Sequence, residues 1–389
     1  MRRAIVTLAA LSVSSLLSGC GIFGGGDDDE ALQPAELLDV DETLRVRKRW
    51  STKVGDDAND LRLGLSPVSD TIRAYAASRN GLVHGLEIDT GRKLWTARLD
   101  ILLSAGPTVA DGRVIVAGLD GDVVAIDAGD GKVLWQRNIA AEILAPPAVG
   151  GERVVLRSAD GRLIALDAST GDEKWVIEEE VPDLSLRGTA SPTLAANLVV
   201  CGFDNGRLMG VELLSGEVVW DQIITPPTGR SDLERLVDLD GRSIAVGREL
   251  YITGFQGQVG SLLLDSGQLL WTRELSSYHG PGVDWNMVFV SADGGDVVAL
   301  SRANGVEQWR NRELTRRELT APTPFGNAIA VGDLEGYLHF LDAQTGAVIA
   351  RRRVDGARIS TAPHAQGDLL LVQADSGVVA AYEVAVQDR

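Results

Sequence analysis

The clearest hydrophobic pattern along the chain is a short apolar run that stands between two polar turns. The stretch GDVVAIDAGDGKVLW, residues 121–135, contains one such run, and GRLIALDASTGDEKW, residues 161–175, repeats it. Apolar and β-branched residues in short runs bounded by glycine and aspartate predict β-strands joined by hairpin turns. The chain is therefore expected to consist largely of repeated hairpins.

Pairs of glycines ten residues apart mark this pattern seven times. The pairs are Gly81/Gly91, Gly121/Gly131, Gly161/Gly171, Gly206/Gly216, Gly257/Gly267, Gly295/Gly305 and Gly336/Gly346. Four residues after the second glycine stands a tryptophan in six copies, and Ala350 in the seventh. A period near forty residues identifies an internal repeat, as found in propellers and solenoids.

The chemistry of one repeat predicts its local structure. The first glycine, such as Gly121, opens a hairpin turn. Six residues later comes a carboxylate, Asp127 in this copy, which can accept hydrogen bonds from backbone N–H groups of the second turn. The second glycine, Gly131, can adopt the positive φ that such a turn requires. The tryptophan then lies on the next strand, where we expect it to pack between neighbouring sheets.

Two further strands precede each hairpin, as in residues 145–149 and 153–157, so each repeat supplies four strands. Repeated four-stranded units predict an all-β fold, a β-propeller, and the strand count gives eight blades. The strand that contains Trp50 is not preceded by a hairpin strand, and the strand that begins at Gly377 is not followed by a tryptophan strand. We therefore expect an eight-bladed propeller over residues 45–385, closed by pairing of the N- and C-terminal strands, with residues 386–389 as a tail.

The N-terminal segment carries the features of an export signal. A basic start is followed by an apolar run too short to span a bilayer, which predicts a signal peptide over residues 1–19. The sequence Leu17-Ser18-Gly19-Cys20 resembles a bacterial lipobox, which implies that Cys20 is lipidated and becomes the mature N-terminus. Gly21 in place of aspartate implies sorting to the outer membrane. An ordinary signal peptide with an incidental cysteine is the alternative. The glycine-rich and acidic residues that follow predict a flexible tether over residues 20–44.

Composition narrows the classes of function. The formal net charge is −18, and such a surface repels nucleic acid. The two cysteines, Cys20 and Cys201, stand in unlike contexts, and Cys201 in an apolar run is expected to be a buried small hydrophobe. The four histidines fall in different repeats without the spacing of metal ligands. We therefore expect no metal, no cofactor and no small-molecule substrate.

Two insertions interrupt the repeat after neighbouring tryptophans, Trp175 and Trp220. In a propeller, the loops that follow the fourth strands of the blades all lie on one face. Residues 181–188 and 226–241 are therefore expected to lie side by side on that face. The first insertion contains Leu184 and Leu186, which alternation places on one side, followed by Arg187. Such a group is typical of an interface. The alternatives are that the leucines cap the channel or enter the next blade, and that the second insertion is a solvated loop.

Several longer motifs resemble one known family. The units match the propeller repeat of pyrroloquinoline-quinone type, and RWSTKVG, VPDLSLRGTASP, LERLVDLDG and VGDLEGYLHFLDAQTG resemble the BamB family of outer membrane lipoproteins. The resemblance implies a non-enzymatic subunit of the β-barrel assembly machinery, on the periplasmic face of the outer membrane. It implies docking onto the periplasmic domains of BamA. Residues that match the family's contact with BamA are Leu184, Leu186, Arg187, Asp238 and Asp240.

Two other functions share this repeat. Quinone-dependent dehydrogenases are longer and carry an adjacent pair of cysteines near the cofactor, and here Cys201 stands alone. The carboxylates at the turns recur in most repeats, and a catalytic pair would not need copies around a ring. A periplasmic scaffold or sensor propeller with another partner is the second alternative.

Overall fold

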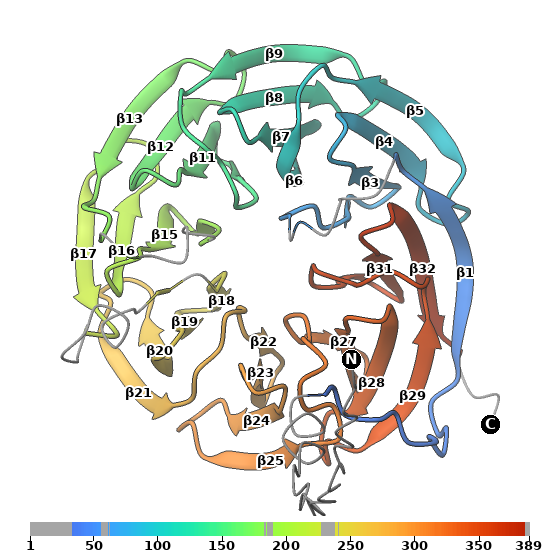
Figure 1. The fold of residues 1–389 in the computed structure, drawn as a ribbon. Coiled ribbons are helices and arrows are strands. Elements are labelled where there is room, and N and C mark those ends of the chain that lie inside the picture. Colours follow the sequence, from blue (N-terminus) through green and yellow to red (C-terminus); the bar gives the residue numbers. More distant parts are fainter. Residues whose placement is uncertain are drawn as a thin grey trace, which may run out of the picture. The chain divides into compact units, whose positions relative to one another are not determined.

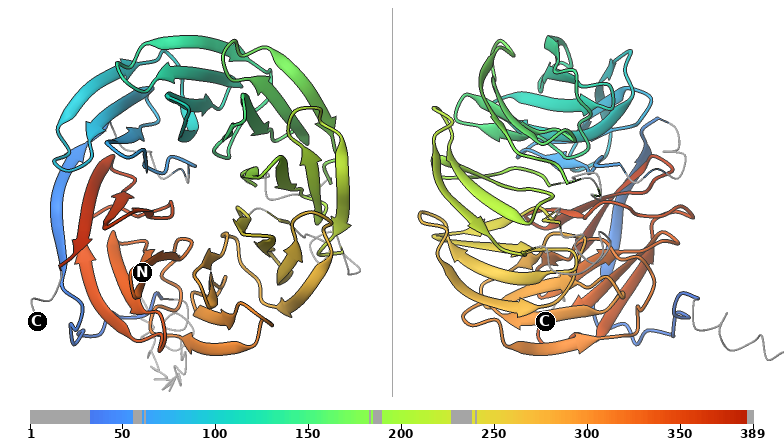
Figure 2. Two further views of the ribbon diagram at one scale, coloured as in Figure 1. Left: turned by 180° about the vertical axis from the view of Figure 1, so that it is seen from behind. Right: turned by 60° about the vertical axis from the view of Figure 1, so that its left-hand side comes forward.

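The computed structural model describes residues 33–55, 61, 63–182, 184, 190–226, 238–239 and 241–385. In these residues all regular structure is β-strand, and the strands form eight four-stranded antiparallel sheets arranged in a ring (Figure 1). Figure 2 shows the same ring from behind and obliquely. The all-β, eight-bladed propeller expected from the repeat is confirmed.

The first seven blades each use four strands that are consecutive in the chain. Blade 1 contains β2 (Val68–Ser69), β3 (Arg73–Ala77), β4 (Leu82–Glu87) and β5 (Lys93–Arg98), and blade 2 contains β6 (Leu103–Ala110), β7 (Arg113–Gly118), β8 (Asp122–Asp127) and β9 (Val133–Asn138). Blade 3 contains β10 (Ala148–Gly150), β11 (Arg153–Arg157), β12 (Arg162–Asp167) and β13 (Glu173–Glu178). Blade 4 contains β14 (Thr193–Ala195), β15 (Leu198–Gly202), β16 (Arg207–Glu212) and β17 (Val218–Ile223). Blade 5 contains β18 (Ile244–Val246), β19 (Glu249–Thr253), β20 (Gln258–Leu263) and β21 (Leu269–Glu274). Blade 6 contains β22 (Gly282–Val283), β23 (Met287–Ser291), β24 (Val297–Ser301) and β25 (Glu307–Asn311). Blade 7 contains β26 (Thr323–Phe325), β27 (Ala328–Gly332), β28 (Tyr337–Asp342) and β29 (Val348–Arg353).

Blade 8 joins the two ends of the chain. Three of its strands are C-terminal, β30 (His364–Gln366), β31 (Leu369–Gln373) and β32 (Val378–Val384), and the fourth is the N-terminal strand β1 (Val46–Lys53). Strand β1 runs antiparallel to β32, from the pair Val46 and Val384 to the pair Lys53 and Val378. The predicted closure through the strand at Trp50 is confirmed. It matters because an unpaired ladder would leave an edge open to aggregation.

The turn carboxylate and the tryptophan act as the repeat predicts. In blade 2, Asp127 Oδ1 accepts the N–H groups of Gly129 and Asp130 at 2.8 and 3.1 Å. The indole of Trp135 donates to the carbonyl of Ala168 in blade 3 at 2.9 Å. A Cβ on Gly171, whose φ is +74°, would lie 2.7 Å from that ring. Each tryptophan of the repeat therefore locks its blade to the next, and only glycine leaves room for it.

Ala350 replaces the tryptophan at the single junction where no receiving turn exists. Blade 8 takes its fourth strand from the N-terminus, so its third and fourth strands are not joined by a hairpin. There is no turn glycine on which an indole could pack. The small Ala350 side chain is buried instead in a cluster that contains Val46 at the start of β1.

Residues 34–44, here called the strap, lie on the propeller ahead of β1. The Ala35 N–H donates to the carbonyl of Thr315 at 3.0 Å, and the N–H groups of Thr43 and Leu44 donate to that of Ile349 at 3.1 and 3.2 Å. The residue contacts divide the chain between Gln33 and Pro34. The tether was expected over residues 20–44, and its last residues, in the strap, form these hydrogen bonds with the propeller. The predicted signal peptide with Cys20, most of the predicted tether and the predicted tail from residue 386 lie outside the described residues.

Candidate docking face

One face of the ring carries the connections between blades. The chain leaves the fourth strand of each blade beside that blade's turn between its second and third strands: the N–H groups of Ile139, Glu179 and Ile224 donate to the carbonyls of Gly121, Gly161 and Gly206. We call this the connection face. The turns between the first and second strands, and between the third and fourth, lie on the opposite face because adjacent strands are antiparallel. Loops that leave the fourth strands share one face, as expected.

Both insertions belong to this face and enter adjacent blades. The first connects β13 to β14, and the second connects β17 to β18. Their ends meet where Thr193 Oγ1, at the start of β14, donates to the carbonyl of Ser243 at 2.8 Å. Leu184 lies in the first insertion with 44% of its surface exposed. The other predicted contact residues, Leu186, Arg187 and Asp240, lie outside the described residues.

Asp238 is not placed as the sequence suggested. A carboxylate on a docking surface is expected to be exposed, but this side chain is fully buried. Asp238 forms an isolated antiparallel bridge with Phe255, whose N–H donates to the Asp238 carbonyl at 2.8 Å. The following residue, Leu239, is buried among side chains of blades 4 and 5. Through this bridge and the burial of both residues, Asp238 anchors the end of the insertion rather than presenting a surface charge.

A cavity of about 470 Å³ opens on the connection face. Connections from seven of the eight blade junctions line it, with apolar side chains such as Leu63, Leu144 and Ala321 and hydroxyl groups such as Ser191 and Thr361. Both insertions end beside this cavity, since Ser191 follows the first and Gly241 ends the second. The face therefore combines an exposed leucine, two long connections and a hollow.

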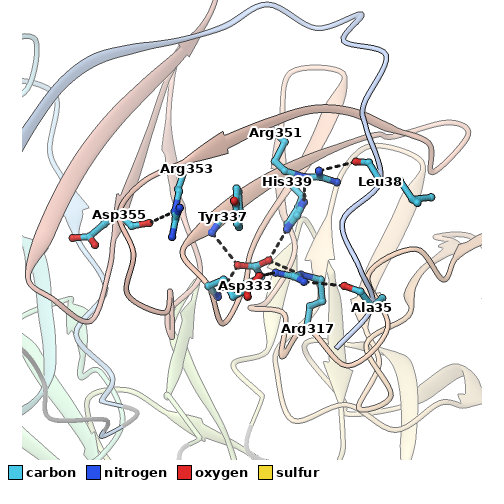
Figure 3. Close-up of polar contacts among 10 residues, drawn as sticks. Ala35, Leu38, Arg317, Asp333, Tyr337, His339, Arg351, Arg353 and Asp355 are labelled. Atoms are coloured by element: carbon cyan, nitrogen blue, oxygen red, sulfur yellow. Dashed lines mark hydrogen bonds and ion pairs between the residues drawn. The ribbon is translucent and has the colours of Figure 1, made fainter. Parts of the chain in front are cut away.

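A buried polar cluster lies under the strap at blade 7 (Figure 3). Asp333 Oδ2 accepts from Arg317 Nε at 2.7 Å and from His339 Nε2 at 2.9 Å. Arg351 Nε donates to His339 Nδ1 at 3.2 Å, so the imidazole is neutral with its proton on Nε2. Burial lowers the pKa of His339. Burial alone would raise the pKa of Asp333, but the hydrogen bonds from His339, the Tyr337 N–H and Arg317 bring it below its usual value.

The cluster holds the strap and has the features of a structural clamp. Arg317 Nη1 donates to the carbonyl of Ala35 at 2.9 Å, and Arg351 Nη1 donates to that of Leu38 at 2.8 Å (Figure 3). Asp333 and His339 are fully buried and oriented by these contacts, away from the cavity lining. The sequence analysis did not predict this role of His339 and Asp333, because the strap that they help to hold is nearly three hundred positions away in the chain.

Two further observations concern metal binding and the thiol of Cys201 in the described residues. Among them, no group of three or more His, Cys, Asp or Glu side chains is arranged to hold a metal ion. Cys201 is buried in the core between blades 3 and 4, as expected, and burial raises the pKa of its thiol to about 12. A thiol with that pKa is not a nucleophile near neutral pH. The part of the chain that the structure describes contains no helix with the length and apolar character needed to span a membrane.

Comparisons with known proteins agree on one family. The family model described as outer membrane protein assembly factor BamB matches residues 79–311 and 293–387. The protein of that name from Pseudomonas aeruginosa is 44% identical over 97% of this chain and 98% of its own length. The crystal structure of BamB from Moraxella catarrhalis superposes with a TM-score of 0.79 at 29% identity, over 87% of this chain and all of that one.

A quinohemoprotein alcohol dehydrogenase from Comamonas testosteroni shares the architecture at 16% identity, with a TM-score of 0.68 over 88% of this chain and 77% of the enzyme. At that identity the likeness extends to the fold alone.

Proposed function

Because the chain belongs to the family of the outer membrane protein assembly factor BamB, we propose that it is a non-catalytic lipoprotein subunit of the β-barrel assembly complex. It docks through its connection face onto the periplasmic domains of BamA and supports folding and insertion of outer membrane proteins. The single observation that carries the docking face is that both long insertions end side by side at the start of β14 and β18, next to a cavity and the exposed Leu184.

The chain is anchored to the periplasmic face of the outer membrane through Cys20. Attachment of two or more acyl chains gives stable anchoring, which a single chain does not. The strap begins at Pro34, so the residues between Cys20 and the strap can extend over at most about 45 Å, at roughly 3.5 Å per residue. This length keeps the propeller close to the membrane and within reach of a membrane-bound partner.

The contact itself is formed by Leu184 and Leu186 as apolar anchors, with Arg187 beside them and Asp240 on the second insertion. Residues of this kind at the centre of an interface carry most of the binding free energy. Asp238, which is buried, contributes by holding the second insertion in place. Arg187 supplies a positive charge that can pair with an acidic group of the partner and fix the register of the contact.

The test of the docking face is binding of purified BamA periplasmic domains, measured by calorimetry. Leu186→Glu and Arg187→Ala are each expected to weaken binding by roughly thirtyfold or more, which corresponds to about 2 kcal/mol, with an unchanged Tm. Leu214→Glu and Arg248→Ala make the same changes at exposed positions of the opposite face and are expected to bind normally. Wild-type affinity in folded Leu186 and Arg187 variants would exclude these residues from the contact.

The test of the anchor is Cys20→Ala. The variant is expected in the soluble periplasmic fraction or as unprocessed precursor, while the wild-type protein stays with the outer membrane. Intact mass spectrometry of the wild-type protein is expected to show acyl groups on an N-terminal Cys20. A mature protein without acyl mass would contradict the anchor and leave the docking face untouched.

A further inference from the structure

The cavity on the connection face contains a single charged side chain among the described residues that line it, Arg242. The rest of the lining is apolar or uncharged, from Leu63 and Leu144 to Thr361. A cation at this place is unexpected in a chain of net charge −18. Arg242 directly follows the second insertion in the chain, so the cavity lies beside the end of that insertion.

The backbone around Arg242 is fixed by close packing of two connections. A Cβ on Gly280 would lie 2.3 Å from the Arg242 carbonyl oxygen, and one on Gly241 would lie 2.9 Å from the Gly280 nitrogen. The next residue, Ser243, is buried, and its carbonyl accepts the hydroxyl of Thr193. Arg242 therefore projects from a rigid support, as a preorganised binding group does.

Arg242 is an exposed residue that lines the cavity. The neighbouring protein partly desolvates its guanidinium and lowers the pKa of Arg242. His364, on blade 8, also experiences the charge: burial first, and then Arg242, lower the pKa of His364 to about 4. The neighbouring imidazole is thus neutral near pH 7 and does not repel an anion or compete for one.

Arg242 is exposed and differs from two arginines that are buried elsewhere. Arg157 pairs with Asp204 at 2.8 Å, and Arg317 pairs with Asp333 at 2.7 Å. Over the described part of the chain, Arg242 makes no ion pair, and no charged group is among the causes of its lowered pKa. A cation without a counter-ion in an otherwise uncharged cavity is available to an anionic ligand, and charge-assisted hydrogen bonds of this kind are stronger than neutral ones.

We propose that this cavity is a subsite for a carboxylate of the docking partner, in which Arg242 receives an Asp or Glu side chain from an acidic protein segment. The inference rests on the proposed docking face and adds the chemistry of the segment that it accepts. A carboxylate matches the planar guanidinium with two parallel hydrogen bonds, and the hydroxyls of Ser191 and Thr361 lie in the same lining. Because the net charge of the protein is −18, pairing with the Arg242 cation also favours one register of the acidic segment.

The first experiment does not involve BamA. Mature protein is titrated with the peptide Ac-Gly-Glu-Leu-Glu-Gly-NH2, with its Gln-for-Glu counterpart and with citrate, and Arg242 Nε–H is followed by NMR. We expect the Glu peptide to shift this resonance saturably, the Gln peptide to leave it unchanged, and Arg242→Gln to abolish binding of the Glu peptide. Arg248→Gln, an exposed arginine on the opposite face, is the matched control and is expected to retain binding. Absence of peptide binding, or tighter binding of citrate than of the peptide, would overturn the proposal.

The second experiment asks whether the partner uses the subsite. Arg242→Gln is expected to weaken binding of the BamA periplasmic domains at least tenfold, and Arg242→Lys by a smaller factor because it keeps the charge and loses the paired hydrogen bonds. Equal affinity of wild type and Arg242→Gln for BamA would overturn the inference while the docking face stands. If the wild-type protein does not bind BamA, the proposed function fails, and the peptide titration alone decides whether the carboxylate site exists.

Discussion

At the scale of single residues, the eight tryptophans occupy two different environments. Seven belong to the repeat and donate their indole N–H to a carbonyl of the next blade, as Trp135 does to Ala168 at 2.9 Å. Trp285 stands at the turn between β22 and β23 and is 89% exposed. That turn is held by Asp284 Oδ1, which accepts the N–H groups of Asn286 and Met287. The same residue type therefore serves the core in one place and the surface in the other.

This difference predicts that replacing tryptophan with alanine changes the free energy of unfolding by different amounts at the two kinds of position. Trp135→Ala removes a buried indole between blades and is expected to lower the free energy of unfolding by about 3–5 kcal/mol. Trp285→Ala, the matched control, is expected to change it by less than about 0.5 kcal/mol. Urea unfolding of both variants checks the pair. A loss below about 1 kcal/mol for Trp135→Ala would contradict the role of the indole in joining the blades.

The partly buried His364 gives the protein a pH dependence of known sign. Its folded-state pKa is about 4, whereas an unfolded histidine has a pKa near 6.5. Between these values the unfolded chain binds more protons, so stability is full above about pH 6.5 and falls as the pH drops toward 4. From pH 7 to pH 5 this group is expected to cost about 2 kcal/mol. His364→Gln is expected to remove that part of the pH dependence, measured by urea unfolding at both values. The same pH dependence in wild type and variant would mean that His364 titrates normally.

At the scale of elements, the strap shows how one segment is held by side chains of another. Arg317 and Arg351 donate to the strap carbonyls of Ala35 and Leu38, and both are oriented by Asp333 and His339. The strap contributes few buried side chains of its own, so these charge-assisted hydrogen bonds are an important part of its attachment.

We therefore expect Arg351→Leu to loosen the strap. Cleavage after Glu36 by a glutamate-specific protease is expected to become several times faster than in the wild-type protein, since that bond lies between the two clamped carbonyls. Arg353→Leu on the same strand is the matched control, because Arg353 contacts Asp355 and the Tyr337 ring and not the strap. Equal cleavage rates in all three proteins would show that the clamp does not hold this segment.

At the scale of the whole molecule, the ring depends on pairing between its two ends. The β1–β32 ladder supplies the fourth strand of blade 8 and buries Trp50 against blade 1. Deletion from Gly377 onward removes β32 and exposes the edges of both β31 and β1. We expect this variant to aggregate or to melt at a much lower temperature. Deletion of residues 386–389 alone is the control and is expected to behave as wild type. Light scattering and thermal melts test both, and a monomeric truncated protein with a wild-type Tm would contradict closure by this ladder.

The sequence by itself determined the features that each repeat encodes locally. The strand order, the turn carboxylates such as Asp127, the turn glycines and the eight-blade count follow from residues at fixed short spacing. Closure through Trp50 and Gly377 also followed, because counting strands left one unpaired strand at each end. These inferences succeed because a repeat shows the same local physics several times over.

Only the tertiary structure decided the features that depend on residues far apart in the chain. Ala350 is small because blade 8 lacks a third-to-fourth hairpin. Asp238 is buried beside Leu239, which packs between blades 4 and 5, and the strap is fixed by arginines nearly three hundred positions away. Arg242 likewise lines a cavity only because its own connection and six others meet there. A side chain's burial and charge environment is set by the neighbours that folding brings to it, and no local pattern records which neighbours those are.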